Sequence, residues 1–292
     1  MSETAALVSS NGFEYGVKHF YNPKSGLITD ILFEALALSL DETNKLLGLG
    51  AIYVGNHRQT LNVSIAANQL VRVHTKPRRY NCNFSWRELV VYENASFLVL
   101  NKPSGIPSHP SVDNVLENSL TQTSLAMQKE LLITHRLDTL TSGLIVYAKT
   151  TEFVRDFNIQ ILNRSVDKKY VALVETTREL PTKLIDYMEP SPRAPKKISS
   201  VATEGWAVCE LEILAQKRRA DLTWIKINLL TGRTHQIRAQ LSNQGAPIMG
   251  DTLYGARHPY LQDAIALRAC ELQFNWRGQR LVLNLPEEFE KY

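Results

Sequence analysis

The chain has 292 residues, of which 44% are hydrophobic and 21% are charged, and its formal net charge of +4 makes it mildly basic. This apolar content is sufficient for a sizeable core and excludes a globally disordered chain. The three cysteines are scattered and form no Cys-x-x-Cys pair, and there is no basic leader and no apolar run of about 18 residues, so we expect a protein of the reduced cytoplasm without a membrane anchor.

The first part of the chain is expected to hold an extension over 1–26 and a small domain over 27–76. The expected elements of that domain are, in order, a helix over 27–40, a helix over 42–49 with Asp41 as its N-cap, a strand over 51–54, a turn at Gly55 and Asn56 and a strand over 70–74. A polar, basic stretch around Pro77 predicts a linker over 77–85. A larger domain is then expected over 86–292.

The larger domain is expected to consist mainly of strands. The predicted strands cover 89–92, 97–100, 144–148, 170–174, 208–215 and 222–230. Helices are predicted after a cap at Thr150 or Thr151 and over 234–241, and loops are predicted over 101–110 and 190–195. Because most connections are too short for crossovers between parallel strands, the pattern indicates an α+β fold with a mixed, largely antiparallel central sheet and peripheral helices.

Basic residues gather in two stretches of the chain. The stretch 56–80 contains five basic residues and no acidic one, namely Arg58, Arg72, Lys76, Arg78 and Arg79. The stretch 217–238 contains six basic residues against one acidic residue, Asp221. Such stretches are typical of contacts with RNA phosphates, but solvated basic faces have the same composition. Charge alone leaves both interpretations open.

The densest group of polar side chains is the segment His135-Arg136-Leu137-Asp138-Thr139-Leu140-Thr141-Ser142-Gly143. It precedes a predicted strand, and catalytic groups concentrate in such loops. A carboxylate at Asp138 could act as a nucleophile or as a general base. It could also accept hydrogen bonds from Thr141 or Ser142 in a turn, which would be a structural role.

Several longer motifs contain these residues. They are His135-Arg-Leu-Asp-x-x-Thr-Ser-Gly143 continued to Ala148-Lys149, Asn101-Lys102-Pro103-x-Gly105 with His109-Pro110, Lys168-Lys169-Tyr170-x-Ala172-Leu173-Val174, Thr231-Gly232-Arg233-x-His235-Gln236-Ile237-Arg238 and Gly250-Asp251-x-x-Tyr254-Gly255. On these motifs, residues 89–289 resemble the RluA family of pseudouridine synthases. The resemblance implies a cofactor-free enzyme that converts uridine in RNA to pseudouridine. One departure is Arg268, where the family commonly has His.

The resemblance also implies roles for individual residues. Asp138 would be the nucleophile, and Arg238 would lie at salt-bridge distance from its carboxylate, with Arg233 as the candidate if Arg238 points away. Tyr170 would stack on the uracil and move a proton, unless it is a packed core aromatic. Arg136 would fill the space left by a flipped base, or else contact a phosphate. Further RNA contacts are expected from Arg233, Lys102 and His135, although His135 could instead be a hydrogen-bonded structural residue.

The segment Leu46-Leu47-x-x-Gly50-Ala51-Ile52-Tyr53-Val54 resembles the small RNA-binding fold of ribosomal small-subunit protein four, which often precedes this catalytic domain. Two departures from its pattern are Gly55-Asn56 in the turn and Ala67-Asn68 before the last strand. The resemblance implies that the basic residues from Arg58 to Arg79 contact RNA phosphates. A structural domain that has lost RNA affinity is the alternative.

Two other classes of protein compete with this interpretation. A catalytically inactive RNA-binding relative would have the same fold, but the intact Asp138, Tyr170 and Arg238 argue against it. A zinc-dependent base deaminase needs about three or four ligands at a workable spacing, and neither His135 nor His235 has such neighbours in the sequence. We therefore expect an RNA pseudouridine synthase that acts on ribosomal or transfer RNA, without a metal or other cofactor, without membrane attachment and as a monomer.

Overall fold

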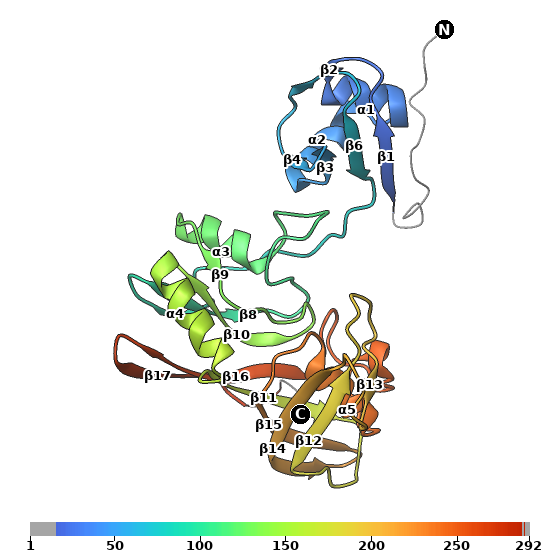
Figure 1. Cartoon of the computed structure of the whole chain (residues 1–292). Coiled ribbons are helices and arrows are strands. Elements are labelled where there is room, and N and C mark those ends of the chain that lie inside the picture. The colour runs from blue at the N-terminus through green and yellow to red at the C-terminus, as the bar shows by residue number, and fades with distance from the viewer. Residues whose placement is uncertain (1–15, 288, 290–292) are drawn as a thin grey trace. The chain divides into compact units, whose positions relative to one another are not determined.

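The computed structural model describes residues 16–287 and residue 289, which form two compact units (Figure 1). Unit 1 consists of the chain up to Asn83 together with His109–Gln122, and unit 2 consists of Phe84–Ser108 and the chain from Thr123 onward. Each unit has its own sheet, so the two are described separately. The expectation that the chain begins without a leader concerns residues outside the described range.

Unit 1 is built from a small sheet and two helices that cover it. Its elements are β1 Val17–Tyr21, β2 Gly26–Leu27, α1 Ile28–Leu36, α2 Leu40–Leu49, β3 Ile52–Val54, β4 His57–Gln59, β5 Ser64–Ile65 and β6 Leu70–His74. The antiparallel sheet has the order β1-β6-β3-β4, and β2 pairs with β5. Phe20, Leu32 and Ile52 are fully buried in its apolar core. The predicted order of helix, helix, strand, turn and strand is confirmed.

Three details of unit 1 differ from the expectations. The predicted extension contains β1, which pairs with β6; a five-residue strand with one buried side chain gives no clear period. Helix α1 ends at Leu36 because Ala37 adopts a left-handed conformation with φ 55°. The N-cap of α2 is Ser39 and not Asp41, because the Ser39 hydroxyl accepts the N–H of Glu42 while the Glu42 carboxylate accepts the N–H of Ser39.

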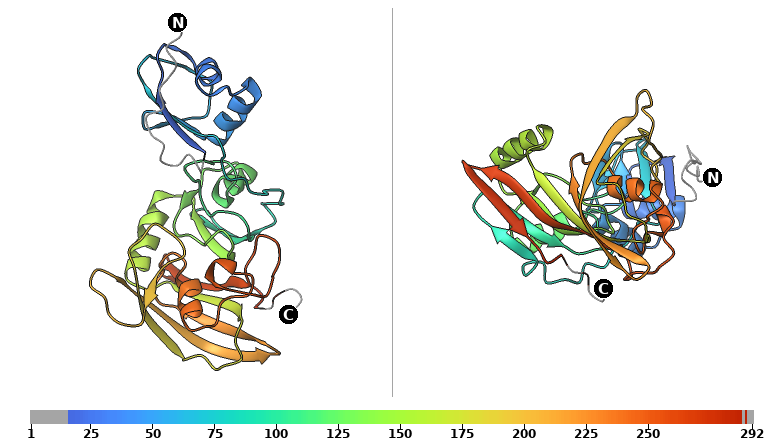
Figure 2. Two further views of the ribbon diagram at one scale, coloured as in Figure 1. Left: turned by 90° about the vertical axis from the view of Figure 1, so that its right-hand side faces the viewer. Right: turned by 90° about the horizontal axis from the view of Figure 1, so that it is seen from below.

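Unit 2 contains one large sheet with helices around it (Figure 2). Its strands are β7 Val90–Glu93, β8 Phe97–Lys102, β9 Leu132–Ile133, β10 Ser142–Ala148, β11 Asp167–Val174, β12 Lys183–Met188, β13 Ile198–Ser199, β14 Ala207–Arg219, β15 Leu222–Leu229, β16 Leu267–Trp276 and β17 Gln279–Asn284. Its helical elements are α4 Thr151–Leu162, α5 Gln236–Asn243 and the 3-10 helix Thr252–Tyr254, whereas α3 Ser119–Met127 crosses from unit 1 into unit 2. The strand order is β13-β12-β14-β15-β11-β16-β10-β8-β7, with β9 paired to β10 and β17 to β16.

The large sheet confirms the predicted α+β class with a largely antiparallel sheet. Within the described ranges, β10 and β16 are the one parallel pair, and they meet at Ser142 and Gly143. Helix α4 begins at the predicted cap Thr150 and buries Phe153 and Phe157 against the sheet. The predicted hairpin is formed by β7 and β8.

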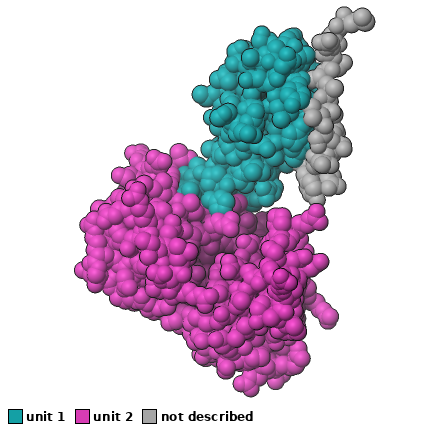
Figure 3. All heavy atoms as spheres, viewed as in Figure 1, with its two compact units in different colours: residues 1–83, 109–122 teal, residues 84–108, 123–292 magenta. Residues whose placement is uncertain are grey.

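Residues 109–122 lie along the chain between two stretches of unit 2, but they belong to unit 1 (Figure 3). The backbone of this segment is tied to α2, because Val115 donates its N–H to the carbonyl oxygen of Leu49 at 2.8 Å. The chain over the predicted linker is also bound to this segment, since Tyr80 donates its N–H to Glu117 at 2.8 Å.

Candidate active site

Asp138 lies in the connection between β9 and β10. The turn that follows it is closed by the backbone, since Thr141 donates its N–H to the carbonyl oxygen of Asp138 at 3.1 Å. The carboxylate is 23% exposed and lies near Arg238 and His235. Because the backbone closes the turn, the Asp138 side chain remains available for chemistry.

The end of this connection requires a glycine. Gly143 has φ +110° and pairs with Ala269 where β10 and β16 run in parallel. A Cβ atom at Gly143 would lie 2.2 Å from the carbonyl oxygen of Ala269. A larger residue would force these strands apart and displace the connection that carries Asp138.

Both chain neighbours of Asp138 are held by hydrogen bonds. Ser108 donates its hydroxyl to the carbonyl oxygen of Leu137 at 2.7 Å and accepts the Leu137 N–H at 3.0 Å. The amino group of Lys102 donates to the carbonyl oxygen of Thr139 at 3.3 Å. The backbone on either side of the carboxylate is therefore fixed.

Lys102 is not the RNA contact that the sequence predicts. Its side chain is fully buried, and its amino group also donates to the carbonyl oxygens of Pro103 and Ile106, both at 2.8 Å. Burial lowers the pKa of Lys102 to about 7, although the charge of Asp138 raises it. A phosphate cannot reach an amino group that is enclosed and bound to three carbonyl oxygens, so Lys102 acts as an internal cross-link.

Replacing Lys102 with methionine should remove a pH dependence of stability. In the unfolded chain Lys102 binds a proton below its ordinary pKa of 10.5, whereas in the folded chain it binds one only below about 7. The unfolded state therefore binds more protons between these values, and stability should rise with pH by up to about 1.4 kcal/mol per unit. Thermal unfolding of both proteins across this interval measures the difference. Equal slopes for the wild type and Lys102→Met would contradict the effect.

Arg238 extends from helix α5 and is fixed by Asp251. Its Nε donates to one oxygen of Asp251 at 2.6 Å and its Nη2 to the other at 2.8 Å, and its Nη1 lies 3.5 Å from Oδ2 of Asp138. The predicted ion pair of Arg238 with Asp138 is confirmed. Burial lowers the pKa of Arg238, but hydrogen bonding to Asp251 and the charge of that carboxylate outweigh burial and raise the pKa above its ordinary value. Asp251 therefore orients the guanidinium toward Asp138.

His235 and Tyr254 complete the surroundings of the carboxylate. Nε2 of His235 lies 3.9 Å from Oδ2 of Asp138, and its Nδ1 lies 3.1 Å from the hydroxyl of Tyr254. The Tyr254 hydroxyl also accepts the N–H of Lys196 at 2.9 Å, so it links His235 to the backbone at Lys196. Burial lowers the pKa of His235, so its ring is neutral near neutral pH.

Sequence reasoning gave no role to Asp251 or Tyr254, although both belong to the Gly-Asp-x-x-Tyr-Gly motif. This motif is the feature of the sequence that could have identified both residues as part of the site. Its function becomes apparent only from the contacts of Asp251 with Arg238 and of Tyr254 with His235.

Tyr170 lies on β11 and is 6% exposed. It pairs with Ala269 of β16, the residue that also pairs with Gly143 of β10, so the sheet places Tyr170 near the end of the Asp138 connection. Burial, and then the charge of Asp138, raise the pKa of Tyr170 well above its ordinary range. Its side chain therefore stays a neutral phenol that can donate its hydroxyl proton in a hydrogen bond.

The other candidate RNA contacts of unit 2 differ in exposure. Arg136 and Arg233 are exposed, whereas His135 is partly buried. Nε2 of His135 accepts the N–H of Val146 at 3.1 Å, and its ring stacks on Phe157. Burial lowers the pKa of His135 to about 3, so the ring is neutral. The hydrogen-bonded structural role of His135 is confirmed, and its neutral ring has no positive charge to offer a phosphate, whereas its RNA contact stays a prediction.

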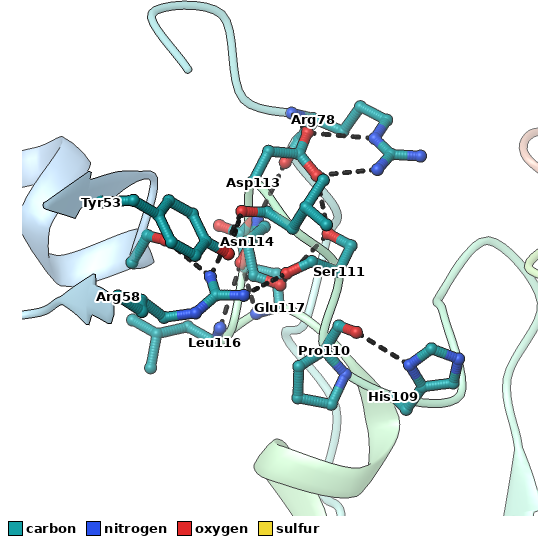
Figure 4. A network of polar contacts seen from close by, with 12 residues as sticks. Tyr53, Arg58, Arg78, His109, Pro110, Ser111, Asp113, Asn114, Leu116 and Glu117 are labelled. Atoms are coloured by element: carbon teal, nitrogen blue, oxygen red, sulfur yellow. Dashed lines mark hydrogen bonds and ion pairs between the residues drawn. The ribbon is translucent and has the colours of Figure 1, made fainter. Parts of the chain in front are cut away.

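The four arginines of the stretch 56–80 make contacts inside unit 1, and Figure 4 shows those of Arg58 and Arg78. The partners are backbone carbonyl groups for Arg58, the ring of Tyr53 for Arg72, Asp113 for Arg78 and Glu117 for Arg79. Lys76 is exposed. Part of the positive charge of this stretch is therefore neutralised within the unit.

The site consists of side chains of unit 2 that the fold brings to one carboxylate. They are Asp138, Arg238, Asp251, His235 and Tyr254, with Tyr170 on the neighbouring strand. Across residues 16–287 and 289, no group of three or more His, Cys, Asp or Glu side chains could hold a metal ion. Among these same residues, no helix has the length and apolar character needed to cross a membrane.

Comparisons with known proteins identify the same family as the sequence motifs around Asp138, Tyr170 and Arg238. The profile of the RNA pseudouridylate synthase family matches residues 96–243, about half of the chain. A chloroplastic RNA pseudouridine synthase 6 of Oryza sativa is 36% identical over 219 residues, which are 66% of this chain and 46% of that protein. The ribosomal large subunit pseudouridine synthase D of Neisseria meningitidis is 31% identical over 221 residues, which are 72% of this chain and 58% of that protein.

A solved structure shares the fold. Human RNA pseudouridylate synthase domain containing 4 superposes with a TM-score of 0.54 at 21% identity, covering 69% of this chain and 90% of the human one. At this identity the likeness concerns the fold alone. The chain spans a little under half the length of its chloroplastic relatives, 46% of the rice protein and 45% of the Arabidopsis thaliana protein.

Proposed function

The chain belongs to the family of RNA pseudouridylate synthases, and on this premise we propose that it isomerises uridine in RNA to pseudouridine. The observation that carries the proposal is the arrangement around Asp138. Its carboxylate faces a guanidinium at 3.5 Å, and that guanidinium is itself held by Asp251. Such an arrangement supports a nucleophile that is kept in one orientation.

The reaction breaks the bond between N1 and C1′, turns the base and joins C5 to C1′. C5 loses its hydrogen and N1 gains one. Asp138 serves as the covalent nucleophile, toward C1′ of the ribose or C6 of the uracil, and Arg238 orients it. Tyr170 stacks on the extruded uracil, and its neutral phenol is suited to passing a proton. Arg136, exposed in the same connection, occupies the space that the base leaves.

Unit 1 is assigned to RNA binding as a module similar to that of ribosomal small-subunit protein four. The order of its elements and the exposed Lys76 support this assignment. Ribosomal RNA and transfer RNA are the two candidate substrates, because the Neisseria relative is named for the large ribosomal subunit and a Saccharomyces cerevisiae relative, 32% identical, is named a tRNA pseudouridine(31) synthase. A monomer in the cytoplasm, with no metal or other cofactor, completes the proposal.

The protein should release tritium from RNA labelled at C5 of uridine, and the release should continue in EDTA. Covalent catalysis by a carboxylate needs no metal as a Lewis acid. The RNA should be one whose fold does not depend on magnesium, so that the chelator acts on the enzyme alone. Complete loss of activity in EDTA would count against the mechanism, and absence of tritium release in any buffer would favour an inactive RNA-binding relative. Mapping pseudouridines in cellular RNA with and without the protein would then identify the target.

A further inference from the structure

The loop 102–108 holds both neighbours of Asp138 and continues directly into the segment 109–122 of unit 1. Its last residue, Ser108, is hydrogen bonded to both the N–H and the C=O of Leu137. The first anchored residue of the segment lies three positions further along the chain, so the two points are at most about 11 Å apart. A displacement of the segment 109–122 can therefore move the loop 102–108, because only two residues separate Ser108 from the first anchored residue.

The first anchor fixes the backbone at the start of the segment (Figure 4). Tyr53 on β3 and Arg58 on β4 are cross-strand partners, and the guanidinium lies over the tyrosine ring. Arg58 donates from Nη2 to the carbonyl oxygen of Ser111 at 2.9 Å, and Tyr53 donates its hydroxyl to that of Val112 at 2.8 Å. The sheet of unit 1 therefore holds two successive peptide groups.

The second anchor consists of two ion pairs. Asp113, which is 6% exposed, accepts the N–H of Arg78 at 2.9 Å, its Nε at 3.0 Å and its Nη2 at 2.7 Å. Glu117 accepts Nε and Nη2 of Arg79 at 2.9 and 2.6 Å, together with the N–H of Tyr80. Burial raises the pKa of Asp113, but the hydrogen bonds from Arg78 outweigh burial and hold that pKa well below its ordinary range, so the carboxylate is charged.

These contacts argue against a phosphate at either arginine. Each guanidinium presents two nitrogens to a carboxylate, which is the strong, directional form of the ion pair. A phosphate brought to Arg78 or Arg79 would meet the negative charge of Asp113 or Glu117. The same geometry suits an internal cross-link between the chain after β6 and the segment 109–122.

We propose that the ion pairs Arg78–Asp113 and Arg79–Glu117 position the nucleophile: by anchoring the segment 109–122 they keep the loop 102–108 bound to the residues on either side of Asp138. The four side chains are positioning residues and do not touch the substrate. The inference deepens the proposed function and rests on it for its catalytic readout. Under this proposal unit 1 contributes to turnover separately from its proposed role in RNA binding.

The variant Asp113→Asn/Glu117→Gln removes both negative charges and keeps every arginine. In the wild type the Leu137 amide is protected by its hydrogen bond to Ser108. We expect this amide to exchange with deuterium at least about tenfold faster in the variant than in the wild type, as measured by mass spectrometry. We expect kcat to fall about tenfold to a hundredfold, because small displacements of a nucleophile have effects of that size. RNA affinity should not weaken, and the salt dependence of affinity should keep its slope. Tighter RNA binding with unchanged exchange and kcat would overturn the proposal in favour of RNA contacts by Arg78 and Arg79.

A second variant, Arg78→Lys, separates anchoring from phosphate binding. Lysine keeps the charge that a phosphate would use but cannot present two nitrogens to Asp113. Faster exchange of Leu137 and a lower kcat are therefore expected, whereas wild-type values of both would count against the anchor. Asp41→Asn, which removes the exposed pair with Lys45 on α2, is the matched control and should change nothing. If the wild type forms no pseudouridine, the proposed function fails, and the exchange rate of Leu137 still decides whether the anchor holds the loop.

Discussion

Asp138→Asn should abolish pseudouridine formation, lowering the single-turnover rate by at least about four orders of magnitude. Asparagine has the same shape and can still accept a hydrogen bond from Arg238, but it lacks the anionic oxygen that forms the covalent bond in the proposed mechanism. The backbone turn should survive, because Thr141 bonds to the carbonyl oxygen of Asp138 and not to its side chain. Tritium release from uridine labelled at C5, with enzyme in excess over RNA, measures the loss.

The loss must be distinguished from unfolding and from weaker RNA binding. Asp30→Asn, at an exposed position in the first turn of α1, is the control for a generic change of one charge, and it should keep full activity. Asp138→Asn should keep the wild-type melting temperature within a few degrees, because the Asp138 side chain is partly exposed and Arg238 keeps its two hydrogen bonds with Asp251. Substantial turnover by Asp138→Asn would refute the nucleophile assignment.

The elements that the sequence predicted well are those whose signal is local. Helix α4 is specified by a capping threonine and by Phe153 and Phe157 on one face, and all of these lie within a few residues of one another. The hairpin of β7 and β8 is equally local. The parallel pairing of β10 with β16 joins positions that are more than a hundred residues apart in the sequence, and the periodicity of neither strand predicts this pairing.

The site shows the same limit. The pair Asp138–Arg238 was expected from a family resemblance and not from physical features of the two segments, which are 100 positions apart. Lys102 was misassigned because a lysine in a polar loop is ordinarily exposed, and only the folded chain brings the carbonyl oxygen of Thr139 to its amino group. Asp113 likewise lies 35 positions from Arg78, so the composition of the basic stretch could not reveal its neutralisation.

Asp251→Asn should lower both stability and turnover. Arg238 and Asp251 are 3% and 1% exposed, so the variant leaves a guanidinium enclosed with a neutral partner. Breaking a buried ion pair in this way costs about 3–5 kcal/mol. The amide replaces one of the two acceptor oxygens with an NH2 donor that faces the N–H groups of the guanidinium, so the guanidinium should turn away from Asp138, and kcat should fall about a hundredfold. Thermal unfolding and tritium release, the latter at a temperature where the variant is folded, measure the two effects.

Two further variants show whether Asp251 acts through Arg238. In Asp251→Asn/Arg238→Met the buried charge is absent, so this protein should be more stable than Asp251→Asn alone while remaining as inactive. Asp186→Asn is the matched control, because Asp186 is also buried beside α5 but accepts its hydrogen bonds from Gln240 and Asn243 and not from a cation. It should lose stability with little change in kcat. Wild-type turnover by Asp251→Asn, or equal losses of kcat in Asp186→Asn and Asp251→Asn, would show that Asp251 supports the fold without orienting Arg238 toward the nucleophile.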